Sequence, residues 1–112
     1  MQLIADLERL LATEESLFRA QLLREDIARL RKLEALARSA ADADAFRKAG
    51  MRIGWTQGDA RTAELREPLE ALLDAIYKGD EPGVTAAWNS FHRTRMERLL
   101  GCLSTPVPKP VD

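Results

Sequence analysis

The chain has 112 residues, of which 46% are hydrophobic and 31% are charged, and its formal net charge is −1. This length suits one domain that buries roughly two thirds of the surface of its unfolded chain, and the composition excludes a largely disordered chain. The single cysteine, Cys102, excludes an internal disulfide, and no run approaches the ~18 consecutive apolar residues of a membrane span. Residues 1–11 carry two acids inside their apolar run, unlike a signal peptide, so we expect a cytoplasmic protein.

The net charge hides an uneven distribution along the chain. Residues 1–18 hold four acids and one base, residues 19–52 five acids and nine bases, residues 53–88 seven acids and three bases, and residues 89–112 two acids and four bases. Blocks of alternating sign suit antiparallel helices, or two chains, that lie against one another. The other interpretation is that the solvated faces simply differ in charge.

Residues 2–38 contain no glycine or proline and have the apolar period of a helix. The apolar positions are Leu3, Leu7, Leu10, Leu17, Leu23, Ile27, Leu30, Leu33 and Leu36, with a second stripe at Ile4, Leu11, Phe18 and Leu22. We expect one long N-terminal helix, bent near residue 13 or 39 if at all. It would be roughly 55 Å long, which exceeds the ~27 Å diameter of a compact domain of this size. Either the helix breaks, or a partner covers its surplus apolar face.

Three glycines at every fourth position, Gly50, Gly54 and Gly58, mark a change of structure. Before them, residues 43–49 predict a short helix that Gly50 would close. We expect a glycine-containing loop over residues 50–59, in which the glycines serve as flexible backbone points. Trp55 in this loop either closes the end of the bundle or faces a partner.

The remaining segment predicts a C-terminal helical hairpin. Residues 65–77 are strongly amphipathic, with Pro68 either in the first turn of the helix or at a kink. Gly79 is expected to end this helix, and Asp80 or Glu81 to cap the next, which continues to residue 103. The fold class is therefore all-α, a small helical bundle in one domain over residues 1–103, followed by a flexible proline-rich tail over residues 104–112.

The inventory of reactive side chains argues against an enzyme. His92 is the only histidine, and a histidine-based nucleophile or a zinc site needs more His, Cys or orienting acids than the chain offers in any local pattern. The glycines match no phosphate-binding spacing. We therefore expect no catalytic residues, no cofactor and no metal, and we expect His92 to be a half-buried helix residue.

Two stretches resemble parts of known families. Residues 75–80 with Trp88, Phe91 and His92 resemble the last helical hairpin of the ligand-binding domains of fatty-acid-regulator-type GntR repressors, in which a late histidine helps to hold a metal ion. This chain has Pro68 or Leu69 where that family places another histidine, so the resemblance implies the hairpin without the metal. Residues 47–52 with Thr56 and Gln57 resemble the start of a helix-turn-helix in phage-repressor-like proteins.

Protein binding is the function that we favour from the sequence. Trp, Arg and Met are enriched at interface centres, and they cluster in the glycine loop, while the overlong first helix needs a partner or a second copy. The expected protein-binding residues are Met51, Arg52, Ile53 and Trp55 in the loop and Leu23, Ile27 and Leu30 on the helix. We therefore expect a non-enzymatic, oligomeric or complex-forming adaptor, chaperone or inhibitor of a larger assembly. The alternative is a nucleic-acid-binding or transcription-regulatory protein, which the mild net acidity disfavours.

Overall fold

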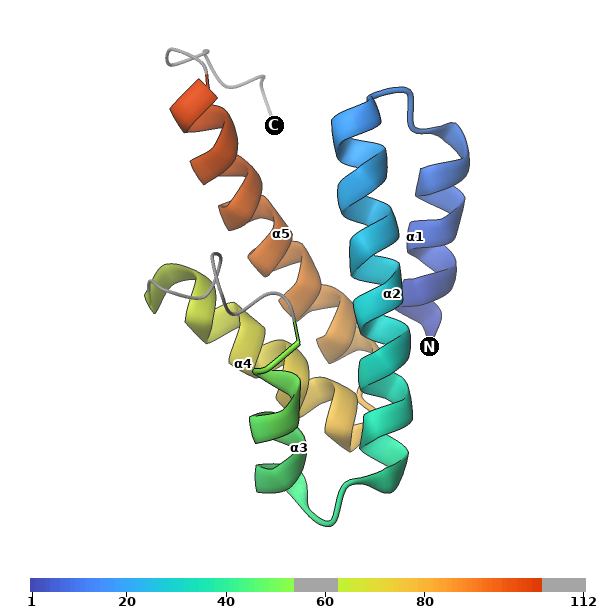
Figure 1. The fold of residues 1–112 in the computed structure, drawn as a ribbon, viewed down its shortest axis with the longest axis vertical. Coiled ribbons are helices and arrows are strands. Elements are labelled where there is room, and N and C mark those ends of the chain that lie inside the picture. The colour runs from blue at the N-terminus through green and yellow to red at the C-terminus, as the bar shows by residue number, and fades with distance from the viewer. Residues whose placement is uncertain (54–62, 104–112) are drawn as a thin grey trace.

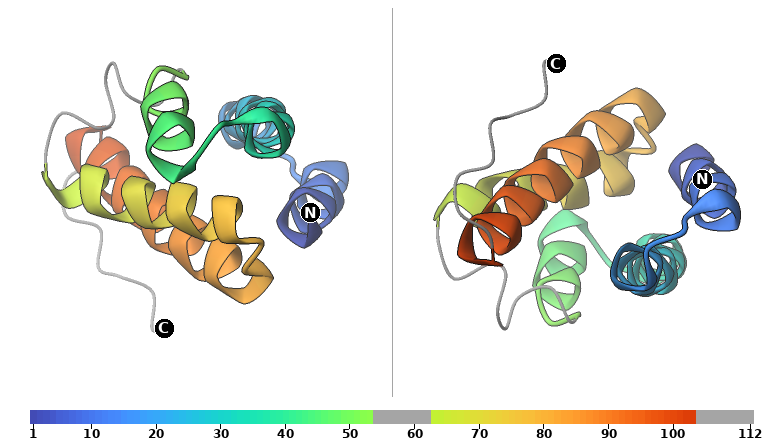
Figure 2. Two further views of the ribbon diagram at one scale, coloured as in Figure 1. Left: turned by 90° about the horizontal axis from the view of Figure 1, so that it is seen from below. Right: turned by 90° about the horizontal axis from the view of Figure 1, so that it is seen from above.

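The chain folds as an all-α bundle, as the sequence predicts. The computed structural model describes residues 1–53 and 63–103, which form five helices and no strand. In chain order these are α1 (Gln2–Thr13), α2 (Leu17–Ser39), α3 (Ala43–Gly50), α4 (Ala63–Lys78) and α5 (Glu81–Leu103). Figure 1 shows α1 and α2 as one antiparallel hairpin and α4 and α5 as a second, with α3 beside the lower half of α2. Both views in Figure 2 show α4 and α5 packed side by side.

The N-terminal region is two helices rather than one long helix, and the chain breaks near residue 13, one of the two places where the sequence allowed for a bend. The first helix ends at Thr13, and Ser16 caps α2 by accepting a hydrogen bond from the Arg19 backbone N–H at 3.3 Å. Glu14 and Ser16 both have extended backbone angles, which turn the chain back on itself. The break lets α1 bury Leu3 and Leu7 against the rest of the bundle instead of extending them into solvent.

The core lies between the two hairpins. Its buried members are Leu3, Ile4, Leu7, Leu23, Ile27, Leu30, Leu33, Phe46, Leu65, Leu69, Leu72, Leu73, Ala75, Ile76, Val84, Trp88 and Phe91. The period of three and four that predicted the helices therefore also predicted which faces turn inward. Trp88 and Phe91 are core residues, as their position on the amphipathic face indicates.

The short helix α3 packs closely against α4 through Gly50, and here the sequence interpretation needs correction. Asp42 caps α3 by accepting a hydrogen bond from the Ala45 backbone N–H at 2.8 Å. Gly50 belongs to the helix and is buried, and a Cβ atom built on it would lie 2.8 Å from Leu73 Cδ2 and 3.2 Å from Leu33 Cδ2. Its role is therefore to allow close helix packing rather than to loosen the backbone.

The C-terminal hairpin follows its local signals. Gly79 ends α4 with φ of 73°, and the Asp80 N–H donates to the Ala75 carbonyl at 3.0 Å in a left-handed helix cap. The Asp80 carboxylate then accepts from the Gly83 N–H at 3.1 Å at the start of α5. Helix α4 runs through Pro68, which removes one backbone donor from its second turn. Trp55, most of the predicted loop and the predicted tail over residues 104–112 lie outside the described residues.

We expect Gly50→Ala to lower the free energy of unfolding by about 1–3 kcal/mol, because overpacking against Leu73 outweighs the better helix propensity of alanine. Urea denaturation measures this change. In a Leu73→Val background the nearest methyl group is gone, so the same substitution should cost less or stabilise the protein. An equal loss in both backgrounds would contradict the close-packing role of Gly50.

Candidate functional site

Three of the expected protein-binding residues lie in the core. Leu23, Ile27 and Leu30 are nearly inaccessible and belong to the main apolar cluster. The sequence interpretation placed them on a face that needed an external partner, but the break between α1 and α2 brings the chain's own helices over that face. Their assignment to a docking surface is therefore corrected, because the fold itself covers them.

The expected protein-binding residues after α3 differ in their exposure. Met51 and Ile53 are half-buried and pack against the core, where they extend the apolar contacts of α3. Arg52 is exposed, and Trp55 lies outside the described residues. The part of this segment that the structure describes therefore offers one exposed side chain, not an apolar docking surface.

A buried ion pair joins α2 to α5. The Asp26 side chain is 0% exposed and the Arg95 side chain 3% exposed, and they form two hydrogen bonds, Nη1 to Oδ1 at 3.1 Å and Nη2 to Oδ2 at 2.7 Å. The Trp88 Nε1–H donates to Asp26 Oδ2 at 3.0 Å, and Arg29 Nη1 lies 3.4 Å from Oδ1. Each carboxylate oxygen of Asp26 thus has two donors beside it, as a buried charge requires.

The ring of His92 completes this network at its edge. It stacks on the Trp88 indole with centroids 4.5 Å apart and planes 10° apart, and its Nδ1 lies 2.7 Å from Arg95 Nη2. Because a guanidinium can only donate, Nδ1 accepts the hydrogen bond and Nε2 carries the ring proton. Burial, and then the charge of Arg95, lower the pKa of His92 from its ordinary value of 6.5, while Asp26 opposes the shift. His92 is half-buried, as the sequence indicates.

The ion pair was not predicted from the sequence, although a signal for it exists. Asp26 falls on the same helical stripe as Leu23, Ile27 and Leu30, and Arg95 falls on the stripe of Trp88 and Phe91. The Arg95 guanidinium carbon also lies 5.1 Å from the Phe91 ring centroid. An acid and a base that each interrupt an apolar face predict a buried pair, since neither is stable there alone.

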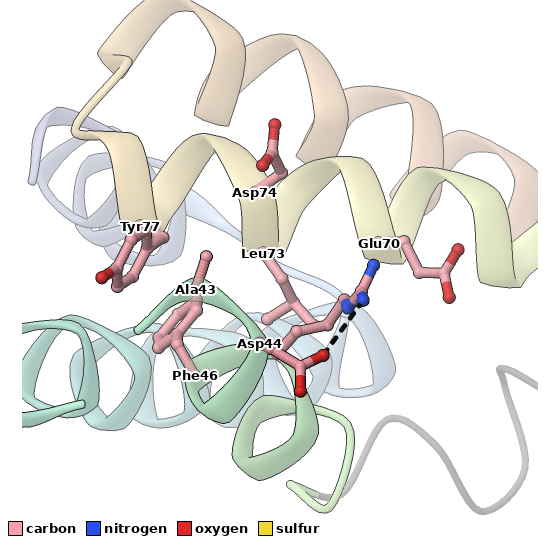
Figure 3. Close-up of a pocket in the computed structure, with 8 residues that line it drawn as sticks. Ala43, Asp44, Phe46, Glu70, Leu73, Asp74 and Tyr77 are labelled. Atoms are coloured by element: carbon pink, nitrogen blue, oxygen red, sulfur yellow. Dashed lines mark hydrogen bonds and ion pairs between the residues drawn. The ribbon is translucent and has the colours of Figure 1, made fainter. Parts of the chain in front are cut away.

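A shallow groove lies between α3 and α4, with a volume of about 350 Å³ (Figure 3). It is lined by Ala43, Asp44, Phe46, Arg47, Glu70, Leu73, Asp74 and Tyr77. Its aromatic floor, where the Phe46 and Tyr77 centroids are 5.5 Å apart, is largely covered by the packing of the two helices. The three carboxylates of its rim are already ion-paired. Asp44 lies 3.3 Å from Arg47 and 3.1 Å from Lys48, Glu70 lies 3.4 Å from Arg66, and Asp74 lies 3.0 Å from Lys78. The groove therefore offers little free apolar or charged surface to a ligand.

Three exposed apolar residues flank the turn between α1 and α2, and we call them the turn patch. It consists of Leu10 in the last turn of α1 and Leu17 and Phe18 in the first turn of α2, which are 54%, 85% and 46% exposed. They are the exposed large hydrophobic residues of the described chain. In Figure 1 the turn lies at the end of the molecule opposite α3. Exposed apolar side chains gathered at one place are typical of an interaction surface.

Polar contacts hold the backbone of this turn in place. The Glu14 carboxylate accepts from the Ser16 N–H at 3.1 Å and from Arg19 Nε at 3.2 Å. The hydrogen bond from the Ser16 backbone, and after it the contact with Arg19, lower the pKa of the Glu14 carboxyl. A turn fixed by a helix cap and a carboxylate presents Leu17 and Phe18 with little loss of entropy on binding.

We expect Asp26→Ala to lower the free energy of unfolding by about 3–5 kcal/mol, because it leaves the Arg95 charge buried without a partner. Thermal or urea denaturation measures the loss. The double substitution Asp26→Leu with Arg95→Met should recover most of it, since it removes both charges. Asp44→Ala, which breaks exposed pairs on α3, serves as the control and should change the midpoint little. A small effect of Asp26→Ala would contradict the buried pair.

We expect the stability of the protein to fall as the pH drops below about 6.5. The lowered pKa of His92 means that the unfolded chain takes up a proton in this range while the folded protein does not, so the free energy of unfolding decreases until the pH reaches the folded pKa. Urea denaturation between pH 7 and 5 measures the slope. His92→Gln keeps a polar side chain but cannot titrate, and its slope should be smaller. Equal slopes in the two proteins would contradict the assignment to His92.

Comparison of the chain with protein-family models, with curated proteins and with solved structures finds no match. Among the described residues, no group of three or more His, Cys, Asp or Glu side chains is placed to hold a metal ion. None of the helices within that part of the chain has the length and apolar character needed to cross a membrane. The function is therefore inferred from the chain's own surfaces.

Proposed function

We propose that the protein is a helical protein–protein interaction module that docks its partner through the turn patch. The observation that carries this proposal is the exposure of Leu10, Leu17 and Phe18 at one end of the molecule. A single exposed leucine is ordinary, but three large apolar residues within two adjoining helix turns are costly to keep in water. Burial against a partner removes that cost.

The proposed role is that of an adaptor, a chaperone or an inhibitor of a larger assembly, acting in the cytoplasm without catalysis. The described part of the chain supports this role because its best-formed polar cluster, around Asp26, is buried and holds α2 to α5. The carboxylates on the rim of the groove between α3 and α4 are already ion-paired. The residues of the turn patch have no role within the fold that requires them to be exposed.

Nucleic-acid binding is the second candidate function, and one surface favours it. Exposed bases gather on α3, after it and on α4, at Arg47, Lys48, Arg52 and Arg66. Asp44 and Glu70 neutralise part of this charge through ion pairs. Because phosphate binding depends on uncompensated positive charge, this surface supports a weaker proposal than the turn patch does.

The test is a pull-down from the native host, with bound proteins identified by mass spectrometry. The baits are the wild-type protein, Phe18→Ser, and Ala86→Ser as a matched polar replacement of an exposed apolar residue on α5. We expect Phe18→Ser to reduce capture of the partner by roughly tenfold or more and Ala86→Ser to leave it unchanged, because central aromatic residues dominate interface energy.

Equal capture by all three baits would contradict docking through the turn patch. Capture that is lost after nuclease treatment and in Arg52→Glu, but not in Phe18→Ser, would support the nucleic-acid function instead.

A further inference from the structure

The turn patch continues into an exposed stripe along α2. At steps of three and four the stripe contains Leu17, Gln21, Arg24, Ala28 and Lys32, all of them exposed. Its chemistry changes along its length, from acidic residues in the turn, through apolar residues at the start of α2, to basic residues in the second half. A surface with this order has an acidic end and a basic end, so the ends of two copies can attract each other.

We propose that the turn patch binds a second copy of this chain, with the two α2 helices antiparallel about a two-fold axis between Gln21 and Arg24. This inference rests on the proposed function and names its partner. A two-fold axis makes the interface self-complementary, so that each acidic end meets the basic end of the other copy. It also places Leu17 and Phe18 of each copy beside the exposed Ala28 of the other, where a small side chain leaves room for a large one.

The charges that such a pairing needs are available. Within the described residues, Glu15 and Lys32 make no ion pair, and both are exposed. Glu15 lies in the turn just before α2, and Lys32 lies roughly 14 Å beyond the axis along α2. Two-fold symmetry then brings the turn of one copy, with Glu15, level with the end of the stripe at Lys32 of the other, twice in each dimer. The neighbouring Arg31 is already paired with Glu8 of α1.

The size of the surface also favours the whole stripe over the patch alone. Three side chains expose a few hundred Å² at most, whereas a stable interface buries roughly 800 Å² on each partner. The stripe from Leu17 to Lys32 covers about four turns of α2, so a contact along its whole length buries a larger area than the patch alone.

Sedimentation equilibrium of the full chain tests this proposal. We expect a monomer–dimer equilibrium for the wild-type protein, which Phe18→Ser weakens by tenfold or more and Ala86→Ser leaves unchanged. Because Phe18 is exposed, circular dichroism should show that the variant stays folded. A wild-type protein that is monomeric up to about 1 mM, or a dimer that Phe18→Ser does not weaken, would overturn the proposal.

A charge exchange tests the orientation of the two copies. Lys32→Glu and Glu15→Lys should each weaken self-association by roughly tenfold, because like charges then meet at both ends of the dimer. An equimolar mixture of the two variants restores both pairs, so a heterodimer should form with close to wild-type affinity at low salt. Arg93→Glu makes the same charge change on α5 and should have no effect.

Failure of the mixture to form a heterodimer would overturn the antiparallel arrangement. These outcomes are separate from those of the proposed function. A monomeric protein that still captures another protein through Phe18 would refute the second copy and leave the interaction module standing. A monomer whose pull-down is unaffected by Phe18→Ser would refute both.

Discussion

The ion pair between Asp26 and Arg95 is the interaction on which the arrangement of the two hairpins depends. Two charges in a dry interior cost several kcal/mol each to desolvate, and only good geometry offsets that cost. Here the guanidinium meets both carboxylate oxygens, and the Trp88 N–H supplies another donor to Asp26. An apolar pair of similar volume could be as stable, but it would fix the register of α2 against α5 less strictly. The pair therefore contributes more to a unique packing than to net stability.

The break between α1 and α2 decides which apolar residues are inside. It allows α1 to return along α2, so that a single amphipathic stretch covers itself and supplies seven of the seventeen buried core residues of the described chain. The same turn leaves Leu10, Leu17 and Phe18 at the point where the chain reverses, beyond the reach of α4 and α5. In this fold, the exposed patch is a consequence of the geometry that buries Leu23, Ile27 and Leu30.

The sequence predicts the C-terminal hairpin well and the N-terminal one poorly, for physical reasons. Gly79 and Asp80 act through their own backbone and side-chain hydrogen bonds, so their effect can be predicted locally. The stretch around Ser16 contains no glycine or proline, and a helix through it would satisfy local propensity. Ser16 and Glu14 supply local capping contacts, but the gain from packing α1 against the bundle also favours the break, and that gain depends on contacts that are distant in sequence. Gly50 was misassigned for a similar reason, because its neighbour Leu73 lies on another helix.

For the candidate surfaces too, the sequence predicts what depends on neighbouring residues and not what depends on contacts distant in sequence. The sequence pointed to protein binding through a face of the first helix, and the helical period correctly showed that this face is apolar. It did not show which third of the face the fold would leave uncovered, because that depends on the position of the turn and on the direction of α5. Leu17 and Phe18 share a stripe pattern with Leu23 and Ile27, yet they differ almost completely in exposure. The apolar period therefore identifies the residues able to bind a partner, while the tertiary fold determines which of them are free to do so.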